Sequence, residues 1–390
     1  MEAHTRAIRV GRNGDVPDPK NKEIRVDRRV FLKTGIGVSA SAVLAGLPAP
    51  KRAIAAGSPD QTTWRLFEVT TRVEINNPIG AGRAWVPLPL TPDTDYHKNL
   101  GQSWTGNAAR ARAVRDDKYG AGMLYAEWPA GDTAPAVEVV SRFATRDRAV
   151  DLKAPGNPVS EDKKVLAQYS KASRYIPTDG IVGKTAQQIT KGLGSDIEKA
   201  RGIYEWIVDN TFRDPKVRGC GIGDIRAMLE TGNLGGKCAD LNALFVGLAR
   251  AAGIPARDVY GVRVADSAEF KCLGRSGDIT KAQHCRAEFY AVRHGWVPVD
   301  PADVRKVVLE ENGGLPLNHP TVQRARVKLF GAWEMNWLAF NYAADVTLPQ
   351  SAGDPVAFFM YPHAETAGER RDSLDPDRFR YTMTARELAG

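Results

Sequence analysis

The stretch from Cys238 to Ala252 constrains the fold most strongly, because its large apolar side chains recur at the spacing of a helix. These side chains are Leu241, Leu244, Phe245 and Leu248. The sequence Gly253-Ile254-Pro255 follows directly, and glycine and proline commonly end a helix. The pattern therefore predicts a helix that begins at a cysteine and buries one of its sides.

The cysteine at the start of this helix follows two glycines and a lysine, in the order Gly235-Gly236-Lys237-Cys238. The first turn of a helix carries about half a positive charge, which stabilises a thiolate and lowers a cysteine pKa from about 8.5. The glycines would let a substrate carbonyl approach the backbone, and the Cys238 N–H could donate to an oxyanion. Asp240, in the same turn, suits the helix dipole and could be purely structural. A lone cysteine on such a helix is more often a small buried hydrophobe than a nucleophile, so Cys238 needs partners.

A thiolate nucleophile needs a base that also returns a proton to the leaving group, and imidazole suits this role because its pKa is about 6.5. Among the six histidines, His284 opens a predicted strand, whereas the others lie in the leader or in predicted loops. Those others are His4, His97, His294, His319 and His363. A second predicted strand, Trp296 to Val299, ends at Asp300. If the two strands form a hairpin, Asp300 can reach the far nitrogen of His284 and fix its tautomer.

Metal binding is the main competing interpretation of this cluster. The ligands would be Cys220, Cys238, His284 and Cys285. No two of these have the short spacing of a zinc motif. Neighbours on a strand point to opposite faces, which predicts that Cys285 is a core residue. The acidic run from Asp372 to Asp377 lacks the glycine and the final glutamate of a calcium loop. We therefore expect no metal and no cofactor.

The rest of the chain indicates an α+β fold. Residues 62–150 contain alternating apolar runs between turn residues, which predicts a β domain of sandwich type. A proline- and glycine-bearing stretch at 153–160 marks a boundary. Residues 160–310 form the predicted catalytic domain, and residues 311–390 a C-terminal extension that packs on this core. The predicted helices before the cysteine cover 163–173, 184–191 and 195–209, and the predicted strands cover 66–75, 84–89, 123–128, 137–143, 258–264, 286–293, 296–299 and 378–384.

The residues around Cys238 resemble the transglutaminase-like superfamily, a branch of the papain-like cysteine enzymes. The matching segments are Gly235 to Asp240, Arg250 to Arg257, His284 and Gly295 to Pro301, in the family's order and spacing. The resemblance covers about residues 181–308. It implies Cys238 as nucleophile, His284 as base and acid, and Asp300 as the residue that orients the histidine. It also implies a core in which the nucleophile lies at a helix N-terminus packed on an antiparallel sheet, often after an N-terminal β domain.

One position departs from the family pattern. In many bacterial proteins of the family that this chain resembles, a tyrosine upstream of the nucleophile supplies a second oxyanion donor. In this chain, Phe212 occupies that position. Phenylalanine cannot donate a hydrogen bond. Trp206, Asn233 or the Cys238 N–H alone could replace it, and the loss of one donor typically costs about 10² to 10³ in rate.

The first 56 residues have the features of an export signal. Arg28 and Arg29 precede Phe-Leu-Lys and a short apolar segment from Thr34 to Leu47. A membrane-spanning helix needs about 20 apolar residues, and that segment is shorter. The leader resembles a bacterial twin-arginine signal with cleavage near Ala56, and an uncleaved amphipathic anchor is the alternative. The mature chain would then be periplasmic or secreted, with no stable membrane insertion.

The formal net charge of +8 suggests an anionic partner, but most of the surplus lies in the leader. Residues 1–56 hold 11 Lys or Arg against 5 Asp or Glu, which leaves a surplus of two in the rest of the chain. No basic stripe interleaved with aromatic residues remains, so no nucleic-acid partner is expected. Twin-arginine export follows folding in the cytoplasm, where thiols are reduced, although the periplasm would permit one disulfide, for example Cys220 with Cys272.

These observations predict an exported cysteine enzyme that cleaves or transamidates peptide or amide bonds of a protein or peptide substrate through a Cys238 thioester. Hydrolysis and transamidation share every step up to the thioester, so the sequence does not separate them. Hydrolysis by a protease or amidase is favoured, because water is the default acceptor unless a site excludes it. The alternative is a catalytically weak envelope binding protein that keeps the fold to hold a peptide or polysaccharide, and Phe212 leaves it open. Neither the natural substrate nor the oligomeric state follows from the sequence.

Overall fold

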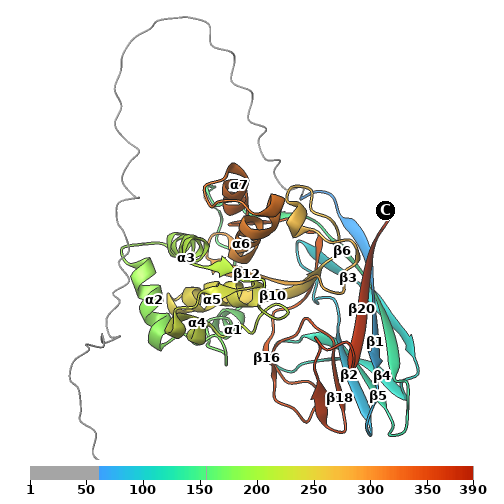
Figure 1. The fold of residues 1–390 in the computed structure, drawn as a ribbon. Coiled ribbons are helices and arrows are strands. Elements are labelled where there is room, and N and C mark those ends of the chain that lie inside the picture. The colour runs from blue at the N-terminus through green and yellow to red at the C-terminus, as the bar shows by residue number, and fades with distance from the viewer. Residues whose placement is uncertain (1–60, 155, 390) are drawn as a thin grey trace, which may run out of the picture. The chain divides into compact units, whose positions relative to one another are not determined.

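The computed structural model describes residues 61–154 and 156–389, and these residues belong to one compact unit (Figure 1). The predicted export signal, residues 1–56, lies outside the described residues. The described chain combines helices with antiparallel sheets, which confirms the mixed α+β class that the sequence predicts. Within these residues, no helix has both the length and the apolar character that crossing a membrane requires.

Two five-stranded sheets make up the β part of the molecule. Their strand orders are β11-β20-β1-β6-β3 and β19-β18-β2-β5-β4, with antiparallel neighbours throughout. The strands are β1 (Arg65–Ile75), β2 (Gly82–Pro87), β3 (His97–Gly106), β4 (Arg110–Arg115), β5 (Gly122–Trp128), β6 (Ala136–Thr145), β11 (Gly277–Asp278), β18 (His363–Thr366), β19 (Glu369–Arg371) and β20 (Phe379–Leu388). Apolar side chains from both sheets, such as Val73 and Leu124, belong to one hydrophobic cluster. The core of this part therefore lies between the two sheets.

The C-terminal residues contribute strands to both of these sheets. β20 lies beside β1, with Thr384 opposite Thr70, as the red and blue strands in Figure 1 show. β18 pairs with β2, with Ala364 opposite Ala84. The sequence places residues 311–390 in an extension on the catalytic core, whereas the last strands of this range complete the sheets that residues 62–150 begin. A pairing between such distant segments leaves no local sequence pattern, which is why the sequence does not predict it.

A four-stranded antiparallel sheet of order β13-β12-β10-β15 forms the centre of the other part. Its strands are β10 (Ala256–Arg263), β12 (Gln283–Ala291), β13 (Gly295–Val299) and β15 (Trp337–Asn341). β12 and β13 form the predicted hairpin, in which Phe289 lies opposite Val297. Gly295 at its turn has a φ of +68°, a backbone conformation that favours glycine. Asp300 follows β13 directly, so the hairpin brings it back toward the start of β12.

Helices cover this sheet, and the helix that begins at Cys238 is the central one. The helices are α1 (Lys163–Gln168), α2 (Gly180–Thr190), α3 (Asp196–Asn210), α4 (Ile225–Thr231), α5 (Cys238–Ala251), α6 (Pro301–Glu310) and α7 (Pro320–Lys328), with single 3₁₀ turns at Lys271–Leu273 and Glu311–Gly313. α5 packs on β12 and β10 and also contacts α2, α3, α4 and α6 (Figure 1). Residues 238–249 of α5 are all buried, so this helix is enclosed rather than one-sided.

Local signals locate several of these elements correctly. α3 begins with the capping box that the sequence predicts, in which Ser195 and Glu198 bond to each other's backbone N–H groups. The remaining short strands form three pairs. These are β7 (Arg148–Ala149) with β14 (Ala332–Trp333), β16 (Ala344–Val346) with β17 (Val356–Phe358), and β8 (Phe212–Arg213) with β9 (Gly235–Gly236), of which only the last is parallel. The β8–β9 pair leads directly into Cys238.

Candidate active site

Cys238 is the first residue of α5, and the turn before it is held by Asp240. The Asp240 carboxylate accepts hydrogen bonds from the backbone N–H groups of Lys237 at 2.9 Å, Ile222 at 3.0 Å and Gly223 at 2.9 Å. These bonds join the 222–223 loop to the first turn of the helix. Asp240 is therefore a structural residue that fixes where Cys238 enters the helix.

The two glycines before Cys238 are required by close packing. A Cβ built on Gly235 would lie 2.4 Å from Phe212 Cζ, and one on Gly236 would lie 2.6 Å from Asp240 Cβ. Any side chain at either position would therefore displace β8 or the first turn of α5. The structure thus gives the Gly-Gly pair a packing role that the sequence, which suggests room for a substrate, does not reveal.

His284 and Asp300 are in direct contact. His284 Nε2 lies 2.8 Å from Asp300 Oδ2, and both side chains are buried. Asp300 is also the N-cap of α6, where its Oδ1 accepts the Asp303 N–H at 3.0 Å. Asn242 of α5 donates from Nδ2 to the same Oδ1 at 3.2 Å. One oxygen of Asp300 is therefore held by the helices, and the other faces the imidazole.

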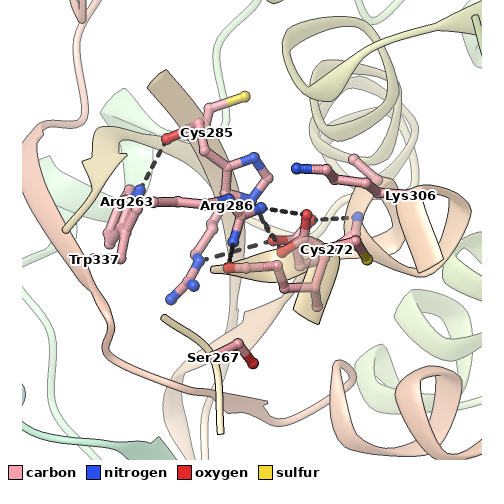
Figure 2. A network of polar contacts seen from close by, with 12 residues as sticks. Arg263, Ser267, Cys272, Cys285, Arg286, Lys306 and Trp337 are labelled. Carbon is pink, nitrogen blue, oxygen red and sulfur yellow. Dashed lines mark hydrogen bonds and ion pairs between the residues drawn. The ribbon is translucent and has the colours of Figure 1, made fainter. Parts of the chain in front are cut away.

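A second carboxylate also reaches the imidazole. Asp303 Oδ2 lies 3.3 Å from His284 Nε2, and Asp303 Oδ1 lies 2.6 Å from Arg263. Arg286 Nε lies 3.8 Å from Asp300, and Figure 2 shows both arginines within this network. Burial and Arg263 oppose a proton on the ring, but the two carboxylates outweigh them and raise the pKa of His284 to about 9. The imidazole is therefore expected to be positively charged at neutral pH.

The same three side chains could also be considered as metal ligands. Among the described residues, His284, Asp300 and Asp303 place one ligand atom each within 4.8 Å of one another. The surrounding charges do not favour a cation, because Arg263 and Arg286 already lie beside the two carboxylates. A metal ligand must also be a neutral imidazole, whereas the pKa of this one is raised to about 9. The cluster therefore suits an imidazolium better than a metal ion.

The Cys238 thiol is buried among groups that stabilise its ionised form. Hydrogen bonds with the Cys220 thiol, the Cys285 thiol and His284 lower the pKa of Cys238 well below its usual range, although burial opposes this. Contact with Cys238 raises the pKa of Cys220, and burial raises that of Cys285. Of these three thiols, only Cys238 is therefore expected to be ionised near neutral pH.

All four cysteines are free thiols. The bridge that the sequence allows between Cys220 and Cys272 is not formed, and the Cys272 N–H donates to Glu311 Oε2 at 2.9 Å. Cys285 is buried as predicted, and in Figure 2 its sulfur points away from the charged network around Arg286. Its thiol nevertheless contacts Cys238, a role that the sequence does not predict.

The Cys238 N–H has no hydrogen-bond acceptor among the described residues, so it is available to an oxyanion. The side chains that the sequence offers as a second donor do not line the cavity at Cys238: Trp206 lies on α3, and Asn233 Oδ1 accepts the Gly235 N–H at 3.2 Å. Tyr361 does line it, and its hydroxyl bonds to the Cys220 thiol. Tyr361 lies far along the chain, and no sequence pattern points to it.

A cavity of about 780 Å³ opens onto Cys238 and His284. Its volume is within the range of small-molecule and peptide sites, about 300 to 1,000 Å³. One wall comes from the connection between β10 and β12, and another from the C-terminal segment that contains Tyr361, Leu374 and Phe379. Asp300 lies behind the histidine, outside the cavity. The β part of the molecule therefore contributes directly to the site.

Two further residues fix the backbone around His284. Trp337 Nε1 donates to the His284 carbonyl at 3.0 Å, and Asn242 Nδ2 donates to the Cys285 carbonyl at 2.8 Å. Gly261 pairs with His284 across β10 and β12, and a Cβ there would lie 2.5 Å from the Trp337 ring. Asn242 could be noticed in the sequence as an amide within an apolar helix, whereas Trp337 carries no such signal.

Comparison with known proteins places this site in a family. Residues 183–301 match the model of the transglutaminase-like superfamily, and this range contains Cys238, His284 and Asp300. The fold and the matched segment thus define a protein with a transglutaminase-like core. A relative from Haemophilus influenzae is 36% identical over 346 residues, which cover 84% of this chain and 93% of the relative, and its function is uncharacterised. Residues 183–301 of this chain therefore form a transglutaminase-like superfamily domain.

A solved structure has a similar fold over most of the chain. It is that of a protein from Cytophaga hutchinsonii that is proposed to be a cysteine protease, with a TM-score of 0.53 and 14% identity. The match covers 84% of this chain and 92% of the other. At this identity, the likeness shows a shared fold alone.

Proposed function

We propose that this protein is a cysteine-dependent acyl-transfer enzyme in which Cys238 attacks an amide or peptide carbonyl. One observation carries the proposal: Cys238 and His284 line the same cavity, which can hold a peptide segment, and His284 contacts Asp300. A thiolate beside an imidazolium is an arrangement that activates a cysteine nucleophile.

Each step then has a group to perform it. The Cys238 thiolate bonds to the carbonyl carbon, and the charge moves to the oxygen, to which the Cys238 N–H can donate. His284 gives its proton to the leaving nitrogen, the C–N bond breaks, and a thioester and a free amine remain. An acceptor then attacks the thioester while His284 takes its proton, the C–S bond breaks, and the thiolate returns. Asp300 holds the imidazole in the required orientation throughout.

Water is the acceptor that we favour, which makes the protein a protease or amidase rather than a cross-linking enzyme. Several residues that line the cavity, such as Lys281 and Arg275, are exposed, so water can reach the thioester. The sequence of the leader supports export through the twin-arginine pathway, and the substrate would then be a protein or peptide of the periplasm or the exterior.

Acyl transfer can be tested with the purified mature protein and a mixed peptide library, with and without a dansylated primary amine. Hydrolysis predicts new peptide ends by mass spectrometry and little dansyl incorporation, whereas transamidation predicts dansylated peptides. Cys238→Ala is the control that should abolish both products. If neither product forms with the wild-type protein, or if both persist in Cys238→Ala, the proposal is wrong.

A catalytically weak binding protein of the cell envelope is the second candidate, and Phe212 favours it. Its side chain is 46% exposed, packs on Gly235 and cannot donate to an oxyanion. In this case the same library would yield peptides that bind but are not cleaved, and Cys238→Ala would bind them equally well.

A further inference from the structure

The cavity beside Cys238 is strongly cationic. Its lining contains eight lysine or arginine residues and one carboxylate, that of Glu310. The cations are Arg213, Arg218, Lys237, Arg263, Lys271, Arg275, Lys281 and Lys306. Outside the leader, the whole chain has a formal surplus of only two positive charges. The positive charge of the protein is therefore concentrated at this cavity rather than spread over its surface.

The structure neutralises only part of this charge. Arg263 pairs with Asp303 and Arg218 with Asp372, each at 2.6 Å, while Arg213 and Lys306 share Glu310. Burial and the neighbouring Arg263 lower the pKa of Lys306, as expected where like charges crowd. Three carboxylates thus serve four of the cations.

The other four cations form no close ion pair among the described residues, although Asp278 and Glu311 act on three of them at longer range. Within the described residues, no carboxylate lies within 4.0 Å of the charged groups of Lys237, Lys271, Arg275 or Lys281. Arg275 donates from Nε only to a backbone carbonyl, that of Asp278, at 2.8 Å. Unpaired cations around a cavity attract and hold anionic groups, because low-dielectric walls focus their field.

These four cations line the same cavity as Cys238 and His284. Lys237 immediately precedes the nucleophile, and the other three lie on the connection between β10 and β12, and His284 is the second residue of β12. The C-terminal segment adds apolar and aromatic groups to the lining, including Leu374 and Phe379. A ligand that fits would carry negative charges near its reacting carbonyl.

We propose that the substrate is an acidic peptide whose Asp or Glu carboxylates lie beside the scissile amide and contact Lys237, Lys271, Arg275 and Lys281. This inference rests on the proposed function, because that reaction requires an acyl carbon, which a peptide supplies and a nucleic acid or free phosphate does not. The carboxylates would form the close ion pairs that these four cations do not form within the described residues, and the cationic field would accelerate their capture.

The charge preference can be measured at Cys238 without a known substrate. The mature protein is treated with sulfonatoethyl methanethiosulfonate, which is anionic, trimethylammonioethyl methanethiosulfonate, which is cationic, or the neutral methyl reagent, and labelling of Cys238 is followed by mass spectrometry. The measured quantity is the labelling rate with the anionic reagent divided by the rate with the cationic reagent. At low salt, we expect this ratio to be about tenfold or more higher for Cys238 than for a neutral small thiol, and to fall as salt screens the cations.

Variants locate the source of this preference. One triple variant combines Lys237→Gln, Lys271→Gln and Lys281→Gln. Its ratio of anionic to cationic labelling rates should fall most of the way to that of the small thiol. Lys163→Gln combined with Lys164→Gln and Lys184→Gln removes three exposed lysines that do not line the cavity, and should leave the ratio unchanged. Equal effects of the two triple variants would overturn the proposal. A ratio near that of the small thiol, with rapid labelling by the neutral reagent, would also overturn it while leaving the nucleophile in place.

Protection experiments then identify the anionic group. A peptide library rich in Asp and Glu should slow labelling of Cys238 by the neutral reagent, and the matched library with Asn and Gln should not. Protection by inorganic phosphate or phosphopeptides alone would contradict the assignment of an acidic peptide. Slow labelling of Cys238 by the neutral reagent at pH 7, in the absence of any peptide, would instead contradict the proposed function.

Discussion

Strand β12 carries two buried charged clusters, and the cluster around His284 opens onto a cavity. Near its start, His284 contacts Asp300 and Asp303 and lines the cavity beside Cys238. Four residues further along the same face, Glu288 is fully buried and contacts Arg148 and Arg257. The two clusters therefore share a strand and a depth, but the His284 cluster also meets the cavity beside Cys238.

The Glu288 cluster shows what buried charge does when it is only structural. Burial acts to raise the pKa of Glu288, but Arg257 and Arg148 lower it overall, so the carboxylate stays ionised. Arg257 also lies 3.9 Å from the Trp296 ring and 3.7 Å from the Tyr342 ring, which encloses it. The His284 cluster differs because an imidazole and a thiol can exchange a proton there. Buried charge alone therefore does not mark a site, whereas buried charge with a proton-transferring pair and a cavity does.

Replacing the nucleophile should separate the two clusters most sharply. Cys238→Ala removes the atom that forms the thioester, so we expect kcat/KM for cleaved peptides to fall by at least about 10⁴-fold. The midpoint of thermal unfolding should change little, since the substitution removes one small side chain. Cys272→Ala, at another cysteine that lines the cavity, is the matched control and should keep most of the activity. Comparable losses in the two variants would show that Cys238 has no special role.

Removing the charge of Asp300 should have the next largest effect. Asp300→Asn keeps an oxygen that can cap α6 but cannot stabilise the imidazolium, so kcat/KM should fall by roughly 10³- to 10⁴-fold. Kinetics and thermal unfolding, measured on the same preparation, check this. A variant that loses stability but retains kcat would place Asp300 with Glu288 as a structural residue.

Glu288→Gln should show the opposite behaviour. It leaves Arg148 and Arg257 without their shared counter-ion, so we expect the free energy of unfolding to fall by about 3 to 5 kcal/mol. The kcat of the folded fraction should stay close to that of the wild type. Urea denaturation and active-site titration with an alkylating agent measure the two quantities separately. A fully folded variant with a much lower kcat would remove the distinction between the clusters.

The pH dependence of the wild type should show the smallest of these effects. The raised pKa of His284, about 9, keeps it protonated at neutral pH, and deprotonation above that value removes the proton that the leaving amine needs. We therefore expect kcat/KM to be nearly constant from pH 7 to about 9 and then to fall. In Asp300→Asn this basic limb should move to lower pH. If kcat/KM of the wild type instead falls with a midpoint near pH 6.5, the carboxylates do not stabilise the imidazolium.

Local sequence patterns predict the parts of the site that lie close together in the chain. The helix from Cys238, the β12–β13 hairpin and the capping box at Ser195 each arise from a few neighbouring residues, and the structure contains all three. The order Asp300-Pro301-Ala302-Asp303 could also have predicted the start of α6, because Asp is a common N-cap and Pro a common first residue.

The rest depends on contacts between distant segments. Arg263, Tyr361 and Trp337 reach the site from β10, the C-terminal segment and β15, and only the fold brings them there. β3 and β4 are exposed edge strands of their sheets, so the alternation of apolar and polar residues that reveals β1 is weak in them. The sequence does not predict the cationic cavity either, because its charged residues are far apart in the chain and only the fold brings them together.

Competitive alkylation across pH tests the reactive thiolate most directly. The mature protein is treated with limiting iodoacetamide between pH 5 and 9, and labelling of each cysteine is quantified by mass spectrometry in the wild type and in His284→Gln. We predict that Cys238 reacts much faster than Cys220, Cys272 and Cys285 at pH 7, and that His284→Gln removes most of this advantage. Labelling of Cys238 at the same rate as the other three, unaffected by His284→Gln, would contradict a thiolate–imidazolium nucleophile.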